Sequence, residues 1–496
     1  MFEPSIKGTA GLLVGGIVLY YVARGIYFAF FHPLARVPGP KLYAFSDIPY
    51  LYQLLSGNLH ECIRQLHEEY GPVVRYTPTD VSFITPGAWR TIYGHRIGTS
   101  ANIAAFPKDP QGYRPSESGH PQILNANEVD HRRHRRVLAH AFSDKALRGQ
   151  ESILQHYVNK LVTRLRELAT AVDNKSSVVD MVRWYNFTTF DIIGDLTFGE
   201  PFGCLDSGGY HPWVAMLFDD IRLITVDEAF RRRPALGSMV WKLVPKKWLA
   251  ARMEHWERSR QTAMRRVESG NTGREDIMSY ILRHNYDEQE GKASRGPTLS
   301  QGELVENANL LLLAGSETTA TVLCGMTYWL LRRHEDITVA SLSGLEYLTA
   351  VIEEGLRMYP AVPPAMLRTV PGKGQEIEGY WIPGGTTVGV PHWAAYQNRS
   401  HFHKADEFIP ERWLEGERDP AFENDCRVVF QPFSVGPRNC IGKNLANGEL
   451  RLVLAKILYN FDLELLPGNE DWHKQKVFVL WDKPDLKVKL TPVVKS

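Results

Sequence analysis

The chain has 496 residues, 44% of them hydrophobic, which is enough to bury a larger core than one small lobe needs. Its 57 basic and 56 acidic residues leave a net charge of +1, so no bulk positive field favours nucleic acid as a partner. Five cysteines are few and odd in number, which fits a reducing compartment better than a disulfide framework.

The N-terminal segment carries the membrane signal of the chain. Residues Gly8–Ala23 are nearly all apolar or small, Arg24 interrupts them, and aromatic residues dominate 26–31. About 20 apolar residues are enough to cross a bilayer, and no small-residue cleavage site is evident. We therefore expect residues 1–31 to form a permanent single-pass anchor rather than a removed signal peptide or a buried core helix.

Basic residues on either side of this anchor predict its orientation. Arg36 and Lys41 follow the apolar segment, whereas Lys7 alone precedes it. Positive charges favour the cytosolic side, so we expect the rest of the chain to lie in the cytosol. N-glycosylation sequons are not used on that side, and the chain has three of them, at Asn174, Asn186 and Asn398.

A proline-rich connector, predicted over 32–45, leads into a folded body over 46–496. Because proline fixes φ and lacks a backbone donor, Pro33 and the Pro38-Gly39-Pro40 element should be stiff and non-helical. Helical periodicity then runs over Tyr50–Tyr70 and ends at Gly71-Pro72. An alternating pattern predicts a hairpin over Val73–Thr85.

A helix predicted over Asp130–Phe142 carries a dense basic run. His131 and Arg135 share one face of it, because residues four apart are neighbours on a helix. The other arginines either face an acidic partner or form an ordinary solvated surface, and both readings stay open. Two further amphipathic helices are predicted over Ser152–Leu168 and Met181–Leu196.

Residues Ser300–Arg333 form one long helical pattern that opens with a Ser300–Glu303 capping box. Gly315 costs such a helix about 1 kcal/mol relative to alanine, but a missing side chain lets it bend or pass close to a cofactor. Glu317 and Thr318 place an acid and an alcohol in an otherwise apolar helix, and such a pair can relay protons. The alternative for Thr318 is a hydroxyl that bonds back to its own helix.

The most informative stretch is 433–442, Phe-Ser-Val-Gly-Pro-Arg-Asn-Cys-Ile-Gly. A helical pattern follows it, so Cys440 should lie at a helix N-terminus, where the dipole and free N–H groups stabilise a thiolate. Such a cysteine is redox-active, nucleophilic or a metal ligand. No second cysteine stands at CxxC spacing, which favours the ligand over the other roles and over a plain buried cysteine. Gly436 and Gly442 permit close backbone approach to something flat, Arg438 can bind a carboxylate, and haem combines these properties.

These ten residues resemble the cysteine-ligand signature of the cytochrome P450 superfamily, the haem-thiolate monooxygenases. Residues 314–319, Ala-Gly-Ser-Glu-Thr-Thr, match that family's [AG]Gx[DE]T[TS] pattern. Glu354-Gly-Leu-Arg357 with Pro410-Glu-Arg412-Trp is similar to its salt-bridge network, and the PGP element to its anchor hinge. The resemblance covers nearly the whole chain and implies a mainly α fold with a small β-rich lobe, preceded by one N-terminal transmembrane helix.

The resemblance also implies which residues hold the cofactor, haem (iron protoporphyrin IX). Cys440 would bind the iron as a thiolate. Histidine at 131 stands where the family usually has a tryptophan that binds a haem propionate. The cofactor-binding residues implied are His131, Arg135, Arg368, Phe433, Gly436, Arg438 and Gly442.

Further roles follow from the same resemblance. Glu317 and Thr318 would be the catalytic residues that manage protons. The haem loop would be supported by Glu354, Arg357 and Arg412. A strand edge over Val362–Leu367 would lie above the haem, and Val477–Leu480 would supply the last turn of the pocket.

The function implied is insertion of one oxygen atom from O2 into a lipophilic small molecule, by hydroxylation or epoxidation. The partners implied are NADPH-cytochrome P450 reductase, the substrate and the endoplasmic reticulum membrane. Two regions would enclose the substrate: an apolar and aromatic loop over Ile97–Asn127, and a mobile roof over 208–270 whose basic and aromatic surface touches the membrane.

Segments 30–41 and 130–143 resemble fungal secondary-metabolism members such as trichothecene-pathway hydroxylases, which implies a terpenoid or polyketide substrate. Two alternatives remain: a haem-thiolate isomerase or dehydratase that needs no external electrons, against which Glu317 and Thr318 argue, and a non-catalytic membrane haem protein.

The chain departs from the family after Arg333. Family members place another helix before the segment that starts at Ile337, and about one average helix, on the order of 10–14 residues, is absent here. That helix flanks the surface near the reductase site, so we expect weaker haem retention than in a version that carries it.

Overall fold

The computed structural model describes residues 6–95, 105–116, 118–170, 176–233, 246–270, 273–287, 292–293, 298–332, 345–415 and 419–493. Up to residue 170 its elements are α1 (Ile6–Ile26), η1 (Tyr27–Phe31), η2 (Pro33–Arg36), α2 (Lys41–Phe45), α3 (Ile48–Ser56), α4 (Leu59–Tyr70), β1 (Val73–Arg75), β2 (Asp80–Phe83), α5 (Pro86–Tyr93), α6 (Glu128–Leu138), η4 (Ala139–Phe142) and α7 (Asp144–Thr170). The middle of the chain forms β3 (Ser177–Asp180), α8 (Met181–Phe198), α9 (Cys204–Ser207), α10 (Pro212–Arg231), α12 (Lys246–Glu268), α13 (Ile277–Asn285), β4 (Tyr286–Asp287), β5 (Lys292–Ala293) and α14 (Gln301–Arg332). The last part forms α16 (Leu345–Met358), β6 (Arg368–Thr369), β7 (Gly374–Ile377), β8 (Tyr380–Pro383), β9 (Thr387–Gly389), α17 (His392–Tyr396), η6 (Pro410–Trp413), η7 (Pro420–Phe422), η8 (Arg427–Val429), η9 (Gly436–Arg438), α18 (Lys443–Asn460), β10 (Phe461–Leu465), β11 (Val477–Phe478), β12 (Leu480–Trp481) and β13 (Lys487–Pro492).

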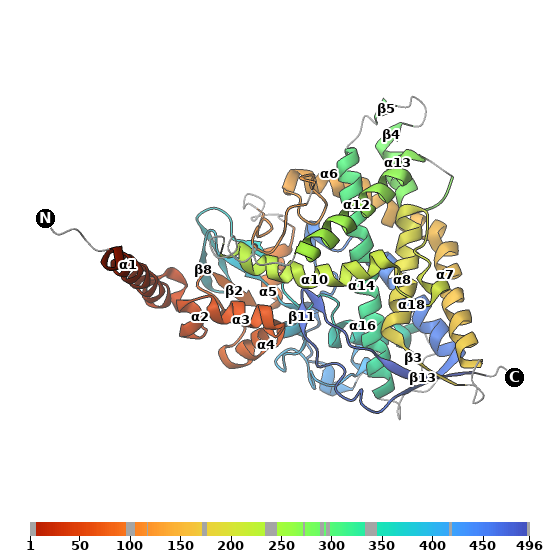
Figure 1. The fold of residues 1–496 in the computed structure, drawn as a ribbon. Helices are drawn as coiled ribbons and strands as arrows, with labels where there is room; N and C mark the ends of the chain where they lie inside the picture. Colours follow the sequence, from red (N-terminus) through yellow and green to blue (C-terminus); the bar gives the residue numbers. More distant parts are fainter. Residues whose placement is uncertain are drawn as a thin grey trace.

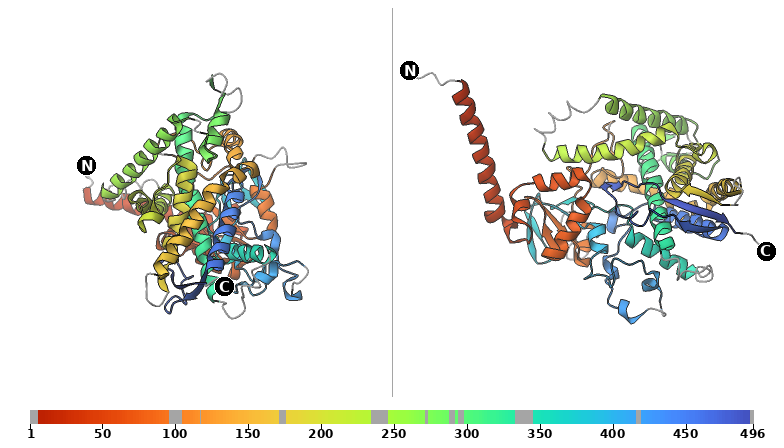
Figure 2. Two further views of the ribbon diagram at one scale, coloured as in Figure 1. Left: turned by 90° about the vertical axis from the view of Figure 1, so that its right-hand side faces the viewer. Right: turned by 60° about the horizontal axis from the view of Figure 1, so that its bottom comes forward.

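The N-terminal helix stands apart from the body. Figures 1 and 2 show α1 projecting away from the rest of the chain, next to the region of short strands. Its segment Leu12–Phe31 has 20 residues with a mean hydropathy of 1.7, and only 11% of its most apolar window is buried. A second helix of sufficient length and hydropathy, α14, is 72% buried and is therefore a core helix. An exposed apolar helix of this length is a candidate transmembrane span, as the sequence predicted.

The connector after this helix is more helical than its prolines predicted. Pro33 starts the 3-10 turn η2, where a missing N–H costs nothing, and α2 follows directly after Pro40. The helix predicted over Tyr50–Tyr70 is two helices, α3 and α4, because Gly57 adopts a left-handed conformation (φ 76°) and ends the first.

The small β-rich lobe is centred on a four-stranded sheet of order β1-β2-β9-β6. The predicted hairpin is present, with Val73 opposite Phe83. β9 runs parallel to β2 and antiparallel to β6, which places Arg368 opposite Val388 at the sheet edge. Val362–Leu367, predicted as a strand, contains only an isolated bridge at Ala365, because its prolines cannot donate ladder hydrogen bonds.

The helical part of the body is built around α14, which runs through its middle in Figures 1 and 2. Its predicted capping box is present: the Glu303 N–H donates to Ser300 Oγ (3.3 Å), and the Ser300 N–H donates to Glu303 Oε2 (2.8 Å). α14 packs against α8, α12, α16 and α18. A Cβ on Gly315 would lie 2.7 Å from Ile193 Cδ1 of α8, so this glycine permits close packing of the two helices. The sequence analysis had instead related the glycine to a bend or to a nearby cofactor.

The basic cluster at the end of α10, which the sequence analysis placed in a membrane-touching roof surface, is instead paired with acidic residues. Arg232 is buried and contacts the buried carboxylate of Asp80 on β2 (2.6 Å). Its two neighbours are also paired, Arg231 with Asp227 and Arg233 with Asp47. These three pairs, which we call the α10 clasp (Arg231, Arg232 and Arg233 with Asp227, Asp80 and Asp47), fasten the roof helix to the β-rich lobe.

Several predictions concern residues outside the described ranges. The missing helix falls within 333–344, between the end of α14 at Arg332 and the start of α16 at Leu345. Ile97–Ala104 of the predicted pocket loop and most of the Asn174 sequon are also outside. The other two sequon asparagines, Asn186 and Asn398, are buried, so neither side chain is accessible for glycosylation in the folded chain.

Candidate active site

The loop around Cys440 is fixed by backbone contacts. The Cys440 N–H donates to the Phe433 carbonyl (2.8 Å), which closes the loop ahead of α18. Gly436 has φ 76°, and a Cβ there would lie 1.9 Å from the Tyr93 carbonyl oxygen, so only glycine fits between this loop and α5. At Gly442, the N-cap of α18, the nearest atoms to a Cβ are 4.0 Å away and include Cys440 Sγ. The close approach predicted for Gly436 is therefore made to protein backbone.

Cys440 combines exposed surface with a largely protein-lined environment. The residue has exposed surface, yet enough protein surrounds it for burial to raise the pKa of its thiol. The Gly442 N–H, Arg135 and Lys443 offset only part of that rise. Burial thus opposes the thiolate that the helix N-terminus favours. A cation bound at the sulfur would supply the missing stabilisation.

Four of the predicted cofactor residues gather beside this loop. His131, Arg368 and Arg438 lie close enough for their charges to interact, and burial with these cations lowers the pKa of His131 to about 3. Burial and Arg368 likewise lower the pKa of Arg438. Arg438 donates to the Ala126 carbonyl (2.9 Å), but its buried Nη1 and the buried Nδ1 of His131 have no partner among the described residues.

The fourth of them, Arg135, is engaged by the loop itself. Its Nη1 and Nη2 donate to the backbone and side-chain oxygens of Asn439 (2.5 and 2.6 Å). It thereby joins α6 to the residue that precedes Cys440. Phe433, half-buried, lies under the ammonium of Lys443, whose Nζ is 5.7 Å from the ring centroid.

The middle of α14 has an open strip in an otherwise buried helix. Ala314 is exposed and Thr318, one turn later, is half-buried, while Ser316 and Glu317 are buried. The Thr318 hydroxyl donates to the Ala314 carbonyl (2.6 Å). This is the hydrogen bond back to its own helix that the sequence analysis kept as the alternative to proton relay. Its oxygen keeps lone pairs that can accept a further hydrogen bond.

Glu317 does not extend freely into a cavity. Its Oε1 binds the ammonium of Lys483, which also donates to the Thr321 hydroxyl (2.7 Å). Lys483 and Glu317 are both almost fully buried, and Oε2 of Glu317 has no partner among the described residues. The carboxylate therefore has one fixed oxygen and one oxygen that can accept a proton donor.

The predicted support network is formed in full. Glu354 and Arg357 pair through two contacts of 2.8 Å, and Arg412 Nε reaches the same carboxylate at 3.2 Å. All three are completely buried, and Asp425 and Trp413 extend the network. Burial alone would raise the pKa of Glu354, but Arg357 and Arg412 hold it below its usual value.

Three residues at the site were not identified from the sequence: Lys108, Lys483 and Glu449. Lys108 lies in the loop over 105–116 and forms a β-bridge with Arg368. Glu449 of α18 is buried and hydrogen-bonds Thr319 of α14. A lysine in a proline-rich loop and a glutamate in an amphipathic helix are ordinary surface signals, so no local pattern distinguished them.

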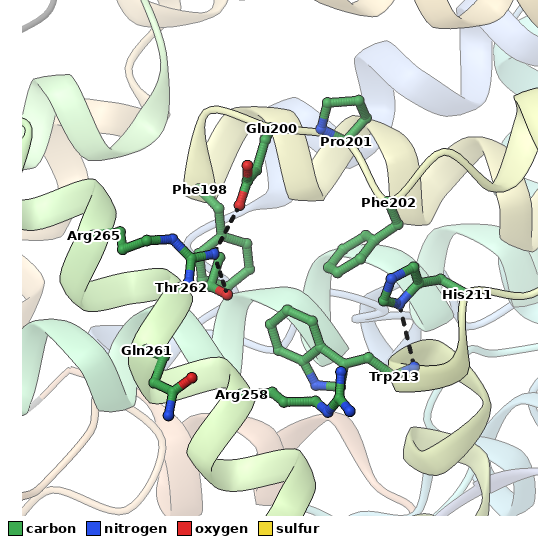
Figure 3. A pocket seen from close by; sticks show the side chains of 10 residues that line it. All are labelled: Phe198, Glu200, Pro201, Phe202, His211, Trp213, Arg258, Gln261, Thr262 and Arg265. Carbon is green, nitrogen blue, oxygen red and sulfur yellow. Dashed lines mark hydrogen bonds and ion pairs between the residues drawn. The ribbon is translucent and has the colours of Figure 1, made fainter.

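A separate cavity of about 360 Å³ lies where α8, α10 and α12 meet (Figure 3). Three aromatic side chains (Phe198, Phe202 and Trp213) and charged residues that include Glu200 and Arg265 surround it, the last two paired at 3.2 Å. It contains none of the residues predicted for the site, so it is a different feature of the molecule.

Comparisons with known proteins identify the family of the chain. The family model described as Cytochrome P450 matches residues 37–490. A cytochrome P450 monooxygenase, lcsI, from Purpureocillium lilacinum is 43% identical over 98% of this chain and 94% of its own length. Cytochrome P450 monooxygenase astJ from Aspergillus oryzae is 40% identical over 95% of this chain and 94% of its own. Averantin hydroxylase from Dothistroma septosporum is 39% identical over 97% and 90%.

A mainly α fold with a small β-rich lobe, one long buried helix and a cysteine loop defines the class as cysteine-ligated haem oxidoreductases. The chain belongs to the cytochrome P450 family and is a P450 monooxygenase. The family implies a haem whose iron is bound by a cysteine thiolate. The residues fit haem. The unpartnered nitrogens of His131 and Arg438 and the surrounding positive charge suit its two carboxylates, and the exposed surface of Cys440 suits its iron.

Proposed function

We propose that this chain hydroxylates a lipophilic small molecule in fungal secondary metabolism, using haem bound by Cys440. The observation that carries the proposal is Cys440 itself, a cysteine with exposed surface beside a cluster of cationic side chains in which Arg368 and Lys108 have no carboxylate partner among the described residues. Similarity to a protein named averantin hydroxylase favours hydroxylation over epoxidation.

Our assignment of the cofactor site uses the predicted residues. Cys440 binds the iron, His131, Arg368 and Arg438 face the two carboxylates, and Phe433, Gly436 and Gly442 shape the loop. Arg135 fixes Asn439, the residue before the ligand, and so positions the thiolate. When bound, the haem supplies an iron that activates O2, and the thiolate ligand favours O–O cleavage.

Protons for this reaction are assigned to Glu317 and Thr318. Glu317 is anchored by Lys483 on one oxygen and has the other oxygen available. Thr318 is the next residue and lies on the open strip, where its oxygen can accept a hydrogen bond while its hydroxyl donates to the Ala314 carbonyl. A carboxylate that delivers protons to a hydroxyl and its water is effective general acid catalysis.

The substrate class follows from the residues around the predicted pocket wall. Phe106 is buried, Tyr113 reaches the Met366 sulfur (3.7 Å), and Leu367 packs near Gly112. An apolar and aromatic wall binds lipophilic ligands but discriminates weakly between similar ones, so it supports the class and not one compound.

Cellular placement is part of the same proposal. The exposed apolar helix α1 anchors the chain in the endoplasmic reticulum membrane, with the body in the cytosol, where NADPH-cytochrome P450 reductase delivers two electrons. Arg136 of the basic run is exposed and available to an acidic partner, Arg132 is exposed but contacts Glu128 (3.7 Å), and Arg133 and His134 are bound to Glu303.

The test is the spectrum of the reduced, carbon-monoxide-bound protein. We expect the red-shifted Soret band of a thiolate ligand, and its loss in Cys440→Ser; absence of the band in the wild type would refute the proposal. NADPH-dependent oxygen uptake with reductase then separates a monooxygenase from an isomerase, which converts substrate without NADPH. Feeding candidate intermediates, averantin among them, identifies the substrate.

A further inference from the structure

Lys108 occupies an unusual position for a lysine. Its loop runs alongside β6: Lys108 forms a β-bridge with Arg368, and the Thr369 N–H donates to the Pro107 carbonyl (2.9 Å). These contacts extend the edge of the four-stranded sheet and fix the backbone of Lys108 next to a predicted carboxylate-binding arginine.

The ammonium of Lys108 is turned inward. It lies 3.9 Å from the ring centroid of Tyr113, a residue held by its contact with Met366. Within the described part of the chain, no oxygen accepts a hydrogen bond from this ammonium. The adjacent carboxylate, Asp109, is occupied by the Gln111 N–H (2.7 Å) and the Thr387 hydroxyl.

Its electrostatic neighbours are cations. Burial lowers the pKa of Lys108 well below its usual value, and Arg368 and Arg438 lower it further. Lys108 in turn contributes to the low pKa of His131. A half-buried lysine among cations is unfavourable unless an anion joins them, and two carboxylates at this place would neutralise the cluster.

The other predicted carboxylate contacts leave room for such a residue. His131 is uncharged, Arg135 is engaged by Asn439, and Arg438 is 3.6 Å from Glu128. Of the cluster, Arg368 and Lys108 are the cations that neither a carboxylate nor an Asn439 oxygen engages among the described residues. A lysine provides a compact point charge, which suits one end of a carboxylate.

We propose that Lys108 binds a haem propionate together with Arg368 and Arg438, and that it provides the charge which His131, in place of the family's usual tryptophan, does not. This inference rests on the proposed function, because it assumes that haem occupies the site. Binding involves a charge-assisted hydrogen bond and no covalent step.

The experiment measures haem release from the full-length holoenzyme to excess apomyoglobin, together with resonance Raman spectra of the propionate bending modes. Lys108→Met should release haem roughly ten- to hundredfold faster, as expected for loss of one hydrogen bond to a charged group. Its propionate mode should shift. Lys108→Arg should restore slow release, and Lys474→Met, at an exposed lysine paired with Asp471, should behave as wild type.

Three outcomes would overturn the inference. If Lys108→Met releases haem at the wild-type rate and its propionate mode does not shift, Lys108 does not contact the propionate. Equally fast release and a lowered thermal midpoint in both Lys108→Met and Lys108→Arg indicate a structural role. Weaker substrate binding with unchanged haem release assigns Lys108 to a substrate anion. If Lys108→Met is not recovered folded, the propionate mode of Lys108→Arg decides, because a guanidinium in contact shifts it.

Failure of the proposed function is recognised separately. Absence of the thiolate Soret band in the wild-type protein would refute both proposals. If the wild-type protein shows that band but Lys108→Met has unchanged haem release and an unchanged Raman mode, only this inference is refuted.

Discussion

Thr318 and Ser316 make the same backbone contact from different faces of α14. Each hydroxyl donates to the carbonyl four residues earlier at 2.6 Å, but Ser316 is fully buried and Thr318 lies on the open strip. The hydrogen bond alone therefore cannot distinguish a structural threonine from a proton-handling one. The two residues differ in their position on the helix, so Ser316 is a matched control for the proposed role of Thr318.

We expect Thr318→Ala to lower the rate of product formation roughly hundredfold, because a positioned proton donor contributes about that much or more to a proton-transfer step. Ser316→Ala removes an equivalent back-bond and should leave the rate within about twofold of wild type. The measurement is product formation from an accepted substrate, with the Soret spectrum as a check on haem content. Equal rates for the two variants would show that Thr318 is only structural.

Glu449 links the two helices on either side of the cofactor site. Burial raises the pKa of its carboxyl to about 8, and the hydrogen bond with Thr319 offsets only part of that rise. The carboxyl is therefore mainly protonated at neutral pH, and α18 meets α14 through an uncharged contact.

This raised pKa predicts a pH dependence of stability. The folded pKa of about 8 exceeds the reference value of 4.5, so the folded state binds the proton more tightly. Its stabilisation is complete below pH 4.5 and is lost as the pH rises to about 8, at about 1.4 kcal/mol per pH unit. Glu449→Gln cannot ionise. Its thermal midpoint should therefore match that of the wild type near pH 4.5 and exceed it near pH 8. Glu423→Gln, at an exposed position, should follow wild type throughout, and parallel curves for Glu449→Gln would contradict the assignment.

At the scale of elements, the α10 clasp decides how the roof is held. Arg232 lies under the Tyr50 ring, with its Cζ 4.4 Å from the ring centroid, while it pairs with Asp80. Burial alone would lower the pKa of Arg232, but Asp80, Tyr50 and Glu228 raise it above its usual value. The roof helix is thus connected to the sheet that carries Arg368 through an ion pair inside the protein.

Arg232→Met should destabilise the protein by about 3–5 kcal/mol, because it leaves Asp80 buried and charged without a partner. Arg265→Met on α12 is the matched control: its ion pair with Glu200 is exposed at 62% and 60%, and its loss should cost about 1 kcal/mol or less. Chemical denaturation of the holoprotein measures both. The double variant Arg232→Met with Asp80→Asn should recover part of the loss; no recovery would mean that the pair is not the cause.

At the scale of the whole molecule, the anchor is continuous with the body. Arg75 of β1 is buried and donates to the Phe28 carbonyl (2.8 Å), and Ala29 is almost fully buried. Gly25 lies so close to the Phe45 ring that a Cβ would be 2.4 Å from it. Residues on the N-terminal side of the predicted boundary at residue 31 therefore contact the body, whereas the residues before Arg24 are exposed where the structure describes them.

A chain that starts at Arg24 should keep the stability of the full-length body, and a chain that starts at His32 should melt a few degrees lower. Removing Phe28 leaves a buried guanidinium donor without an acceptor, which costs about 1–3 kcal/mol. Thermal unfolding of the two truncated holoproteins in the same detergent measures the difference. Equal midpoints would show that 24–31 contribute nothing to the body.

Local sequence determined those features that depend on neighbours along the chain. The capping box of α14, the hairpin of β1 and β2 and the helix after Cys440 were predicted correctly, because caps, alternation and periodicity act within a few residues. The sequence motifs also predicted the family, which the comparisons confirm.

Tertiary structure alone decided the partners of the charged residues. Lys483 joins Glu317 across 166 residues, Arg232 joins Asp80 across 152, and Arg135 joins Asn439 across 304. Burial and pairing at such separations depend on which surfaces meet after folding, and residue type gives no local signal of that meeting. For the same reason the sequence predicted Cys440 as a ligand whose thiolate a helix terminus stabilises, whereas only the folded environment shows that burial raises the pKa of that thiol.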